Sequence, residues 1–457
     1  SPRDTPNRQG QTMQLAHHGT GTRIGAADPG LVHRVRTAVQ HVVAQTSTTA
    51  QVDDLALLAA EQSDTSGGWY PPSVAHGQAG TALLHLYAAR AGMGNLDTAF
   101  DHMREAVLST QVEPLEHHGL FAGTSGLALA LADITRDEPR FRPSLDRLYE
   151  QLADQILAAP PRQTERAVSD LDYDLVTGAA GTLVQLSSLT EPTDRISEAA
   201  DALVDYLIWL SQPAETAGTP YRWLITPAHY PPVGDYHAKY PHGYLNLGLS
   251  HGVPGVAAAL AAAWEAGHRR PGHLEAVATL TRWIRAQAAV DEHGPVWGDG
   301  TPVDEHGQEV TSECGHDRVA WCYGSAGIAG ALLTIATATA DEELHATAVA
   351  AFDAALTRAR HLAPLSPTLC HGLAGLVMLA LEFAPWSTTA RDRLPELVGQ
   401  LLDRHDPDRP LGFTDVPRPG QAVDDPGLLT GATGVALTLL AAVGEERPHW
   451  FRIFLAR

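Results

Sequence analysis

At seven places in this 457-residue chain, a glycine followed three residues later by a second glycine opens a stretch rich in Ala and Leu. One such motif is weak evidence, but seven with the same downstream composition indicate an internal repeat. A repeat unit of this size cannot bury its apolar face alone, so the units must pack against one another. The first glycines of the seven copies are Gly77, Gly123, Gly178, Gly252, Gly324, Gly372 and Gly431.

Longer amphipathic stretches separate the glycine motifs, with apolar residues at helical spacing and charged residues between them. Examples are residues 31–45, 143–159, 195–211, 273–288 and 391–405. The stretches that follow the glycines carry fewer charges and more small residues, which suits a buried position. We therefore predict an all-α fold: a double α/α barrel, or α/α toroid, of seven inner and seven outer helices. An open α-solenoid of the same helix pairs is the alternative.

The repeats are unevenly spaced, and the two longest gaps lie between the glycines at 178, 252 and 324. Their extra residues, about 212–246 and 290–317, are rich in Pro, Gly and aromatic side chains and lack helical periodicity. We expect irregular rim insertions with short strands, a kind of segment that often forms lids or binding surfaces. Residues 28–457 are predicted to form a single toroid domain, and the polar residues 1–27 a flexible N-terminal tail.

The net charge and the number of cysteines limit the partners that the protein can bind and the cellular compartment in which it can work. The formal net charge is −22 and Lys239 is the single lysine, which argues against nucleic acid and membrane surfaces because both are bound through basic patches. We find no apolar run long enough to cross a bilayer and no secretory signal pattern. The three cysteines, Cys314, Cys322 and Cys370, cannot all pair. We expect a soluble cytoplasmic protein whose cysteines bind metal or take part in catalysis.

Two of the cysteines stand at the same place in neighbouring repeats. If the repeats close in register, Cys322, Cys370 and His371 approach a common point. Two thiolates and an imidazole suit Zn²⁺ and leave a fourth position open, as in catalytic zinc sites. Two buried apolar cysteines beside a core histidine are the alternative, and Cys314 is expected to be free. The residues immediately before the seven first glycines, which would share one rim, are His76, Ala122, Thr177, His251, Tyr323, His371 and Thr430.

Other polar residues of this rim suggest acid–base chemistry. His251 lies on the predicted metal's rim, and Asp174 stands four residues before the glycine of the preceding repeat. A carboxylate there would accept a hydrogen bond from the neighbouring imidazole and fix its tautomer. Arg318, four residues before Cys322, is placed to stabilise developing negative charge. His76 has no such neighbours, so we expect it to be structural.

The motifs YDLVTGAAG, SHGVPG, RVAWCYGSAG and CHGLAG occur in this order. With them, the chain from about residue 28 onward resembles the lanthipeptide synthetase C family, the LanC-type class I cyclases, whose members share a barrel of seven plus seven helices. The resemblance implies the following sites, matched residue by residue: Cys322, Cys370 and His371 as zinc ligands, His251 as the acid/base histidine, Asp174 as its partner, and Arg318 and Tyr323 as further active-site residues.

The reaction implied by the resemblance is the formation of a thioether ring in a ribosomal precursor peptide. A peptide thiolate adds to the β-carbon of a dehydroalanine or dehydrobutyrine in the same peptide, and the enolate then takes a proton at the α-carbon. The product is lanthionine or methyllanthionine. His251 is the candidate acid, base or both, and Arg318 would stabilise the enolate. Zn²⁺ is the expected cofactor, without a nucleotide or redox cofactor.

The expected partner is a dehydrated precursor peptide with a leader and a core. Docking of the leader on the insertion around residues 214–240 by strand pairing is a hypothesis from loop composition. Whether the enzyme works in a complex with its dehydratase stays open, as does its origin as a free-standing enzyme or a domain of a larger synthetase. Alternatives for the activity are addition of glutathione to dehydroamino acids and a non-catalytic zinc-stabilised peptide-binding scaffold. A toroidal glycosidase is disfavoured because conspicuous rim carboxylates are few.

Overall fold

Helices dominate the fold, as predicted from the sequence. The computed structural model describes residues 24, 28–63, 68–163, 168–214, 220–232, 234–311, 318–362 and 366–456. The predicted N-terminal tail lies outside these residues except for Ile24. No helix of the described ranges is both long enough and apolar enough to cross a membrane.

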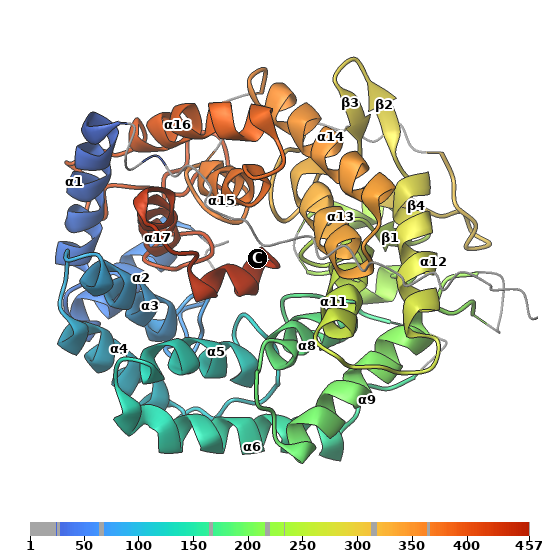
Figure 1. Ribbon diagram of the computed structural model, residues 1–457, viewed down its shortest axis with the longest axis horizontal. Coiled ribbons are helices and arrows are strands. Elements are labelled where there is room, and N and C mark those ends of the chain that lie inside the picture. Colours follow the sequence, from blue (N-terminus) through green and yellow to red (C-terminus); the bar gives the residue numbers. More distant parts are fainter. Residues whose placement is uncertain are drawn as a thin grey trace, which may run out of the picture.

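An inner ring is formed by the helices that follow the glycine motifs (Figure 1). Each of these helices packs against the next one along the chain, and α17 packs against both α15 and α3, so the ring closes. These helices are buried on nearly all sides; in α11, for example, each residue from Val253 to Ala263 is buried. The inner helices of the described chain are α3 (Gln78–Arg90), α5 (Thr124–Thr135), α8 (Ala179–Ser187), α11 (Val253–Glu265), α13 (Ser325–Thr339), α15 (Leu373–Phe383) and α17 (Ala432–Val443).

An outer layer of amphipathic helices surrounds the inner ring, each helix pairing with one inner helix. Only one face of these helices is buried, which agrees with their alternation of apolar and charged residues. Helix α2 (Thr49–Gln62), which follows α1 and packs against α4, was not predicted from the sequence. The outer helices are α1 (Pro29–Gln45), α4 (Leu96–Ser109), α6 (Arg142–Ala158), α9 (Asp194–Ser211), α12 (His273–Ala286), α14 (Glu342–Ala359) and α16 (Thr388–Leu402).

The two glycines of each motif have separate structural roles. The first glycine is the N-cap residue of its inner helix; at Gly324 the backbone has φ 97°, a conformation that favours glycine. The second glycine allows the preceding loop to lie against the first turn of the helix. A Cβ at Gly327 would stand 2.0 Å from the carbonyl oxygen of Trp321, and the other six second glycines have the same close contact, at 1.9 to 2.4 Å.

A closed circle of main-chain hydrogen bonds joins the loops before the inner helices. The carbonyl oxygen two residues before each first glycine accepts an N–H from the loop of the preceding repeat, at 2.8–3.3 Å. The circle includes the bond from Cys322 N–H to the Cys370 carbonyl, at 3.1 Å. The repeats therefore close in register. The seven acceptors, in chain order, are Ala75, Phe121, Val176, Ser250, Cys322, Cys370 and Leu429.

The two predicted rim insertions meet through a short antiparallel pair of strands. Strand β1 (Tyr244–Asn246) of the first insertion pairs with β4 (Gly300–Pro302) of the second, and β2 (Ala289–Asp291) forms a hairpin with β3 (Gly294–Val296). The first insertion also holds η3 (Pro227–His229) and α10 (Tyr236–Lys239). The expectation of irregular segments with short strands thus agrees with the described residues of both insertions.

The C-terminal segment lies at the centre of the ring, a position that was not predicted from the sequence (Figure 1). The 3₁₀ helix η4 (His449–Phe454) packs against α5 and α8. The indole N–H of Trp321 donates to the Phe454 carbonyl at 2.9 Å, and the ring of Phe454 packs edge-on against Trp321 and Phe121. This aromatic cluster supports the residue directly before Cys322. The remaining short helices are η2 (Pro139–Phe141) and α7 (Asp170–Tyr173).

Candidate active site on the rim

Cys322 and Cys370 lie side by side because they occupy equivalent positions in the main-chain circle. Their thiols are close enough for each to shift the pKa of the other. Cys322 is buried and Cys370 is partly buried. Interaction with the Cys370 thiol lowers the pKa of Cys322 to about 6 in spite of burial, and Arg318 adds to the lowering. The same contact raises the pKa of Cys370. The pair therefore holds one negative charge easily, as a metal-binding thiolate must.

His371 is oriented by a buried carboxylate. Its Nε2 donates to Oδ1 of Asp415 at 3.1 Å, and the hydroxyl of Ser366 donates to the same oxygen at 2.8 Å. With Nε2 as the donor, Nδ1 keeps its lone pair, which is the arrangement that a carboxylate imposes on a metal-binding histidine. In the part of the chain that the structure describes, no three His, Cys, Asp or Glu side chains are already gathered tightly enough to hold an ion. The zinc site therefore stays a prediction.

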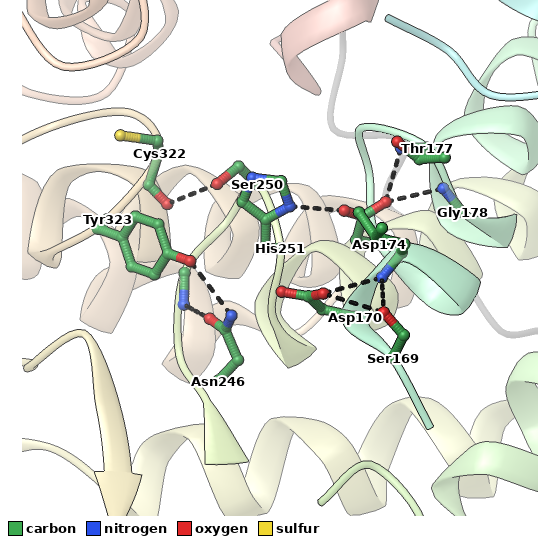
Figure 2. Close-up of polar contacts among 12 residues, drawn as sticks. Ser169, Asp170, Asp174, Thr177, Gly178, Asn246, Ser250, His251, Cys322 and Tyr323 are labelled. Atoms are coloured by element: carbon green, nitrogen blue, oxygen red, sulfur yellow. Dashed lines mark hydrogen bonds and ion pairs between the residues drawn. The ribbon is translucent and has the colours of Figure 1, made fainter. Parts of the chain in front are cut away.

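His251 and Asp174 form the predicted contact between neighbouring repeats (Figure 2). Nδ1 of His251 lies 2.6 Å from Oδ2 of Asp174. The other carboxylate oxygen accepts the main-chain N–H groups of Thr177 and Gly178, both at 2.7 Å. Burial lowers the pKa of His251, but the hydrogen bond and charge of Asp174 outweigh it, so the pKa is raised. Asp174 is fully buried and the His251 side chain is 32% exposed, so the imidazole can reach a ligand while the carboxylate cannot.

Tyr323 stands beside His251, with the two ring centroids 6.4 Å apart. Its hydroxyl accepts a hydrogen bond from the side-chain amide of Asn246 at 3.2 Å (Figure 2). Burial raises the pKa of Tyr323 well above its usual value, so the phenol stays protonated. Tyr323 is therefore a hydrogen-bond donor in this site and not a base.

Arg318 closes the site on the side of the rim insertions. Its guanidinium lies over the ring of Tyr323, 5.2 Å from the centroid, and 3.5 Å from the Asp299 carboxylate. Its side chain is 51% exposed. A pocket of about 190 Å³ opens here, lined by Asp235, Tyr236, Lys239, Tyr240, Tyr244, Asp299, Arg318 and Tyr323. The residues of the first insertion thus form one wall beside the predicted catalytic groups.

The other two residues singled out from the sequence, His76 and Cys314, have different outcomes. Nδ1 of His76 lies 3.8 Å from Oδ2 of Asp425, so it has a carboxylate neighbour, but at a distance too long for a hydrogen bond. Cys314 lies outside the described residues. The predicted metal ligands and the predicted catalytic residues all lie on one arc of the rim.

Four polar residues of this site were missed by sequence reasoning: Asp170, Asn246, Asp299 and Asp415. Asp170 lies on α7 beside His251, and burial raises its pKa although the charge of His251 opposes the change. Asn246 is fully buried, and a polar residue inside the apolar run YLNLGL was the one signal available for it. The others lie in irregular segments whose contacts with the rim depend on tertiary packing.

A protein family and a curated relative match this chain. The family model described as "Lanthionine synthetase C-like protein" matches residues 68–455. A curated relative, "Nisin biosynthesis protein NisC" of Lactococcus lactis subsp. lactis, is 25% identical over 265 residues. That match covers 58% of this chain and 62% of the relative, so it spans less than two thirds of the relative's length.

A solved structure, "Nisin cyclase", shares the fold. It superimposes with a TM-score of 0.73 over 89% of this chain and 97% of that chain, at 20% sequence identity. At that identity the match supports the arrangement of the helices and not the chemistry of the site.

Proposed function

Because this chain belongs to the lanthionine synthetase C-like family, we propose that it is a zinc-dependent cyclase that forms lanthionine or methyllanthionine rings in a dehydrated precursor peptide. In this proposal the two helical rings are a double α/α barrel of the kind predicted from the repeats, and the loops before α11, α13 and α15 present the active site. The observation that carries the proposal is the closed circle of main-chain hydrogen bonds, which makes Cys322 and Cys370 adjacent, with Ser250 next to them.

The residues present fit a zinc ion by the chemistry of their donors. Cys322 and Cys370 are joined by a main-chain hydrogen bond of 3.1 Å, and the interaction of their thiols lowers the pKa of Cys322. His371 is held by Asp415 with Nδ1 left to bind a metal. These three ligands would leave one position for a substrate thiol. Bound zinc would lower the pKa of that thiol from its usual value of about 8.5, so that thiolate forms at neutral pH.

His251 is the group that moves protons in the proposed reaction. Its Nε2 faces away from Asp174, because Nδ1 makes that contact at 2.6 Å. The imidazole takes the proton of the substrate thiol, and the sulfur adds to the β-carbon of the dehydroamino acid. The imidazolium, stabilised by Asp174, then gives its proton to the α-carbon of the enolate, so the proton count balances. One residue can serve both steps because Asp174 supports the charged form between them.

Arg318 and Tyr323 stabilise the negative charge that develops on the substrate carbonyl oxygen. Arg318 supplies a fixed positive charge, and its guanidinium lies over the Tyr323 ring. Tyr323 supplies a neutral O–H group. Donors fixed in place before the reaction lower the barrier because they need no reorganisation as the charge forms. The pocket wall formed by the first rim insertion would contact the peptide, with the leader docking near residues 214–240.

The experiment that tests the proposal combines zinc analysis with a cyclisation assay. Purified protein should carry near-stoichiometric zinc and should convert a dehydrated precursor peptide to a product that no longer reacts with a thiol-alkylating reagent. The alternative reaction is measured in parallel with glutathione and a dehydrated peptide that contains no cysteine. Faster reaction of the free thiol than of the tethered one would favour the glutathione-adding alternative. Zinc binding without turnover of either substrate would favour a binding scaffold.

A further inference from the structure

Asn246 ends β1 and lies fully buried beneath the active site, with a contact at each end of its amide. Its Oδ1 accepts the main-chain N–H of Gly248 at 2.8 Å. Its Nδ2 lies 3.2 Å from the hydroxyl of Tyr323 and 3.3 Å from the hydroxyl of Tyr244. Asn246 therefore contacts a residue of the active site without taking part in the proton transfers of the proposed reaction.

The contact with Gly248 fixes which way round the amide lies. A main-chain N–H can only donate, so the atom that faces it must be the oxygen of Asn246. The NH₂ group then faces the two tyrosines, and its two hydrogens match the two hydroxyl oxygens. Both phenols therefore accept from Asn246, and neither can direct its own hydrogen back at it.

This arrangement determines where the hydrogen of Tyr323 points. Its oxygen is engaged as an acceptor by Asn246, so its O–H is directed elsewhere. Tyr323 itself lines the pocket that opens beside the site, together with Tyr236, so this pocket is the open side toward which the O–H group can be directed. The O–H of Tyr323 is thus turned toward the side from which a peptide would enter.

The ring of Tyr323 is also held in place. A Cβ on Gly248 would stand 2.5 Å from Cε1 of this ring, so a side chain at that position would displace it. Arg318 covers the ring at 5.2 Å from its centroid. The oxygen of Tyr323 consequently has a fixed position. Its hydrogen-bonding partners determine only the direction in which the O–H bond points.

We propose that Asn246 is a positioning residue that turns the O–H of Tyr323 toward the carbonyl oxygen of the reacting dehydroamino acid. This inference rests on the proposed cyclase function. On substrate binding, the O–H of Tyr323 donates to the substrate oxygen, and this hydrogen bond strengthens as the enolate forms. Asn246 transfers no proton and does not touch the substrate.

The test compares Asn246→Asp with Asn246→Ala. Aspartate has the same shape and can still accept from Gly248, but its second oxygen can only accept, so it would draw the Tyr323 hydrogen away from the substrate. We expect N246D to lower kcat by about 10²-fold, the scale of losing one oxyanion donor, with little change in KM. N246A leaves the hydroxyl free to rotate, so we expect a smaller loss than for N246D.

A double-mutant cycle with Tyr323→Phe separates positioning from a general structural role. If Asn246 acts through Tyr323, N246D in the Y323F background should lower kcat by less than about twofold, because the interaction has already been removed. Additive losses, or a loss in N246A as large as that in N246D, would overturn the inference. Wild-type turnover is measured first: its absence would refute the cyclase function itself, whereas wild-type turnover with a fully active N246D would refute the positioning role alone.

Discussion

Two arcs of the same rim are built alike and differ in their side chains. The cysteine arc consists of the residue pairs Ser250–His251, Cys322–Tyr323 and Cys370–His371. The opposite arc consists of Leu429–Thr430, Ala75–His76, Phe121–Ala122 and Val176–Thr177. Both arcs contain N-cap glycines and both contribute to one circle of main-chain hydrogen bonds. The scaffold is therefore shared by all repeats, whereas the proposed zinc ligands and proton-transfer residue come from three of them, and Asp174 comes from the adjacent Val176–Thr177 loop.

The three rim histidines differ in their distance from the nearest aspartate. Nδ1 of His251 lies 2.6 Å from Asp174, Nε2 of His371 lies 3.1 Å from Asp415, and Nδ1 of His76 lies 3.8 Å from Asp425. The carboxylate of Asp425 is occupied by other donors, Gly427 N–H and the Thr430 hydroxyl, both at 2.6 Å. A histidine at the rim position is thus not sufficient for an acid–base site, which also needs a carboxylate within hydrogen-bonding distance of the imidazole.

The largest contrast is expected between two substitutions at equivalent ring positions, Cys370→Ala and Val176→Ala. Cys370→Ala removes a proposed zinc ligand, so we expect loss of bound zinc and a fall in cyclisation of about 10³-fold or more. Val176→Ala removes only packing and should keep both zinc content and activity. Metal analysis and peptide alkylation assays on the two purified variants check this. A C370A protein that retained stoichiometric zinc would refute the ligand assignment.

A smaller contrast is expected between His251→Ala and His76→Ala. Removing the general acid–base should lower kcat by about 10²- to 10⁴-fold, whereas H76A should change it less than about threefold, because His76 makes no hydrogen bond with its aspartate. Steady-state rates with the dehydrated peptide, alongside zinc content as a check on the site, measure both. Equal losses in the two variants would mean that the arcs are not chemically distinct.

The sequence was sufficient to predict the inner helices and the register of the rim, because both depend on a local motif. Gly327 and its six counterparts repeat at a fixed place in each unit, so their shared contact is visible as a pattern. The contact of Asp174 with His251 followed from the same alignment of neighbouring repeats. Contacts that depend only on the repeat units could therefore be predicted from the periodicity of the sequence.

Contacts that depend on irregular segments could not be predicted. Asp415 reaches His371 from the loop before the last repeat, and Asn246 reaches Tyr323 from a strand within a rim insertion. Neither segment follows the repeat, so its position relative to the rim is set by tertiary packing. The central plug formed by η4 was not predicted for the same reason, since a 3₁₀ helix with buried aromatic residues has no periodic signature.

The shared scaffold predicts that glycine substitutions in the two arcs have equal effects on stability. Gly327→Ala and Gly80→Ala would place a Cβ 2.0 and 2.3 Å from a main-chain carbonyl oxygen. We expect each to lower the free energy of unfolding by at least about 2 kcal/mol. Gly399→Ala, in α16 with no atom within 4 Å of its Cβ, should instead raise it by about 0.5–1 kcal/mol. Denaturant unfolding measures all three, and a tolerated G80A would show that the arcs differ in their scaffold too.

The last contrast concerns pH, because two histidines have pKa values shifted in opposite directions. The pKa of His251 is raised by Asp174, whereas burial lowers the pKa of His85, on α3, to about 3. His85 is 1% exposed, and its Nε2 lies 2.7 Å from the Thr46 carbonyl oxygen, to which it donates. Below its unfolded pKa of about 6.5, the unfolded chain binds a proton that the folded chain does not.

The contribution of neutral His85 to the free energy of unfolding is therefore fully present above about pH 6.5. It decreases as the pH falls toward 3. At pH 5 the expected loss is about 2 kcal/mol relative to neutral pH. His85→Gln keeps an N–H donor but cannot titrate, so its free energy of unfolding should fall less between pH 7.5 and pH 5. Denaturant unfolding of both proteins at the two pH values measures the difference. Parallel pH dependence in wild type and H85Q would mean that the imidazole of His85 is not held neutral by burial.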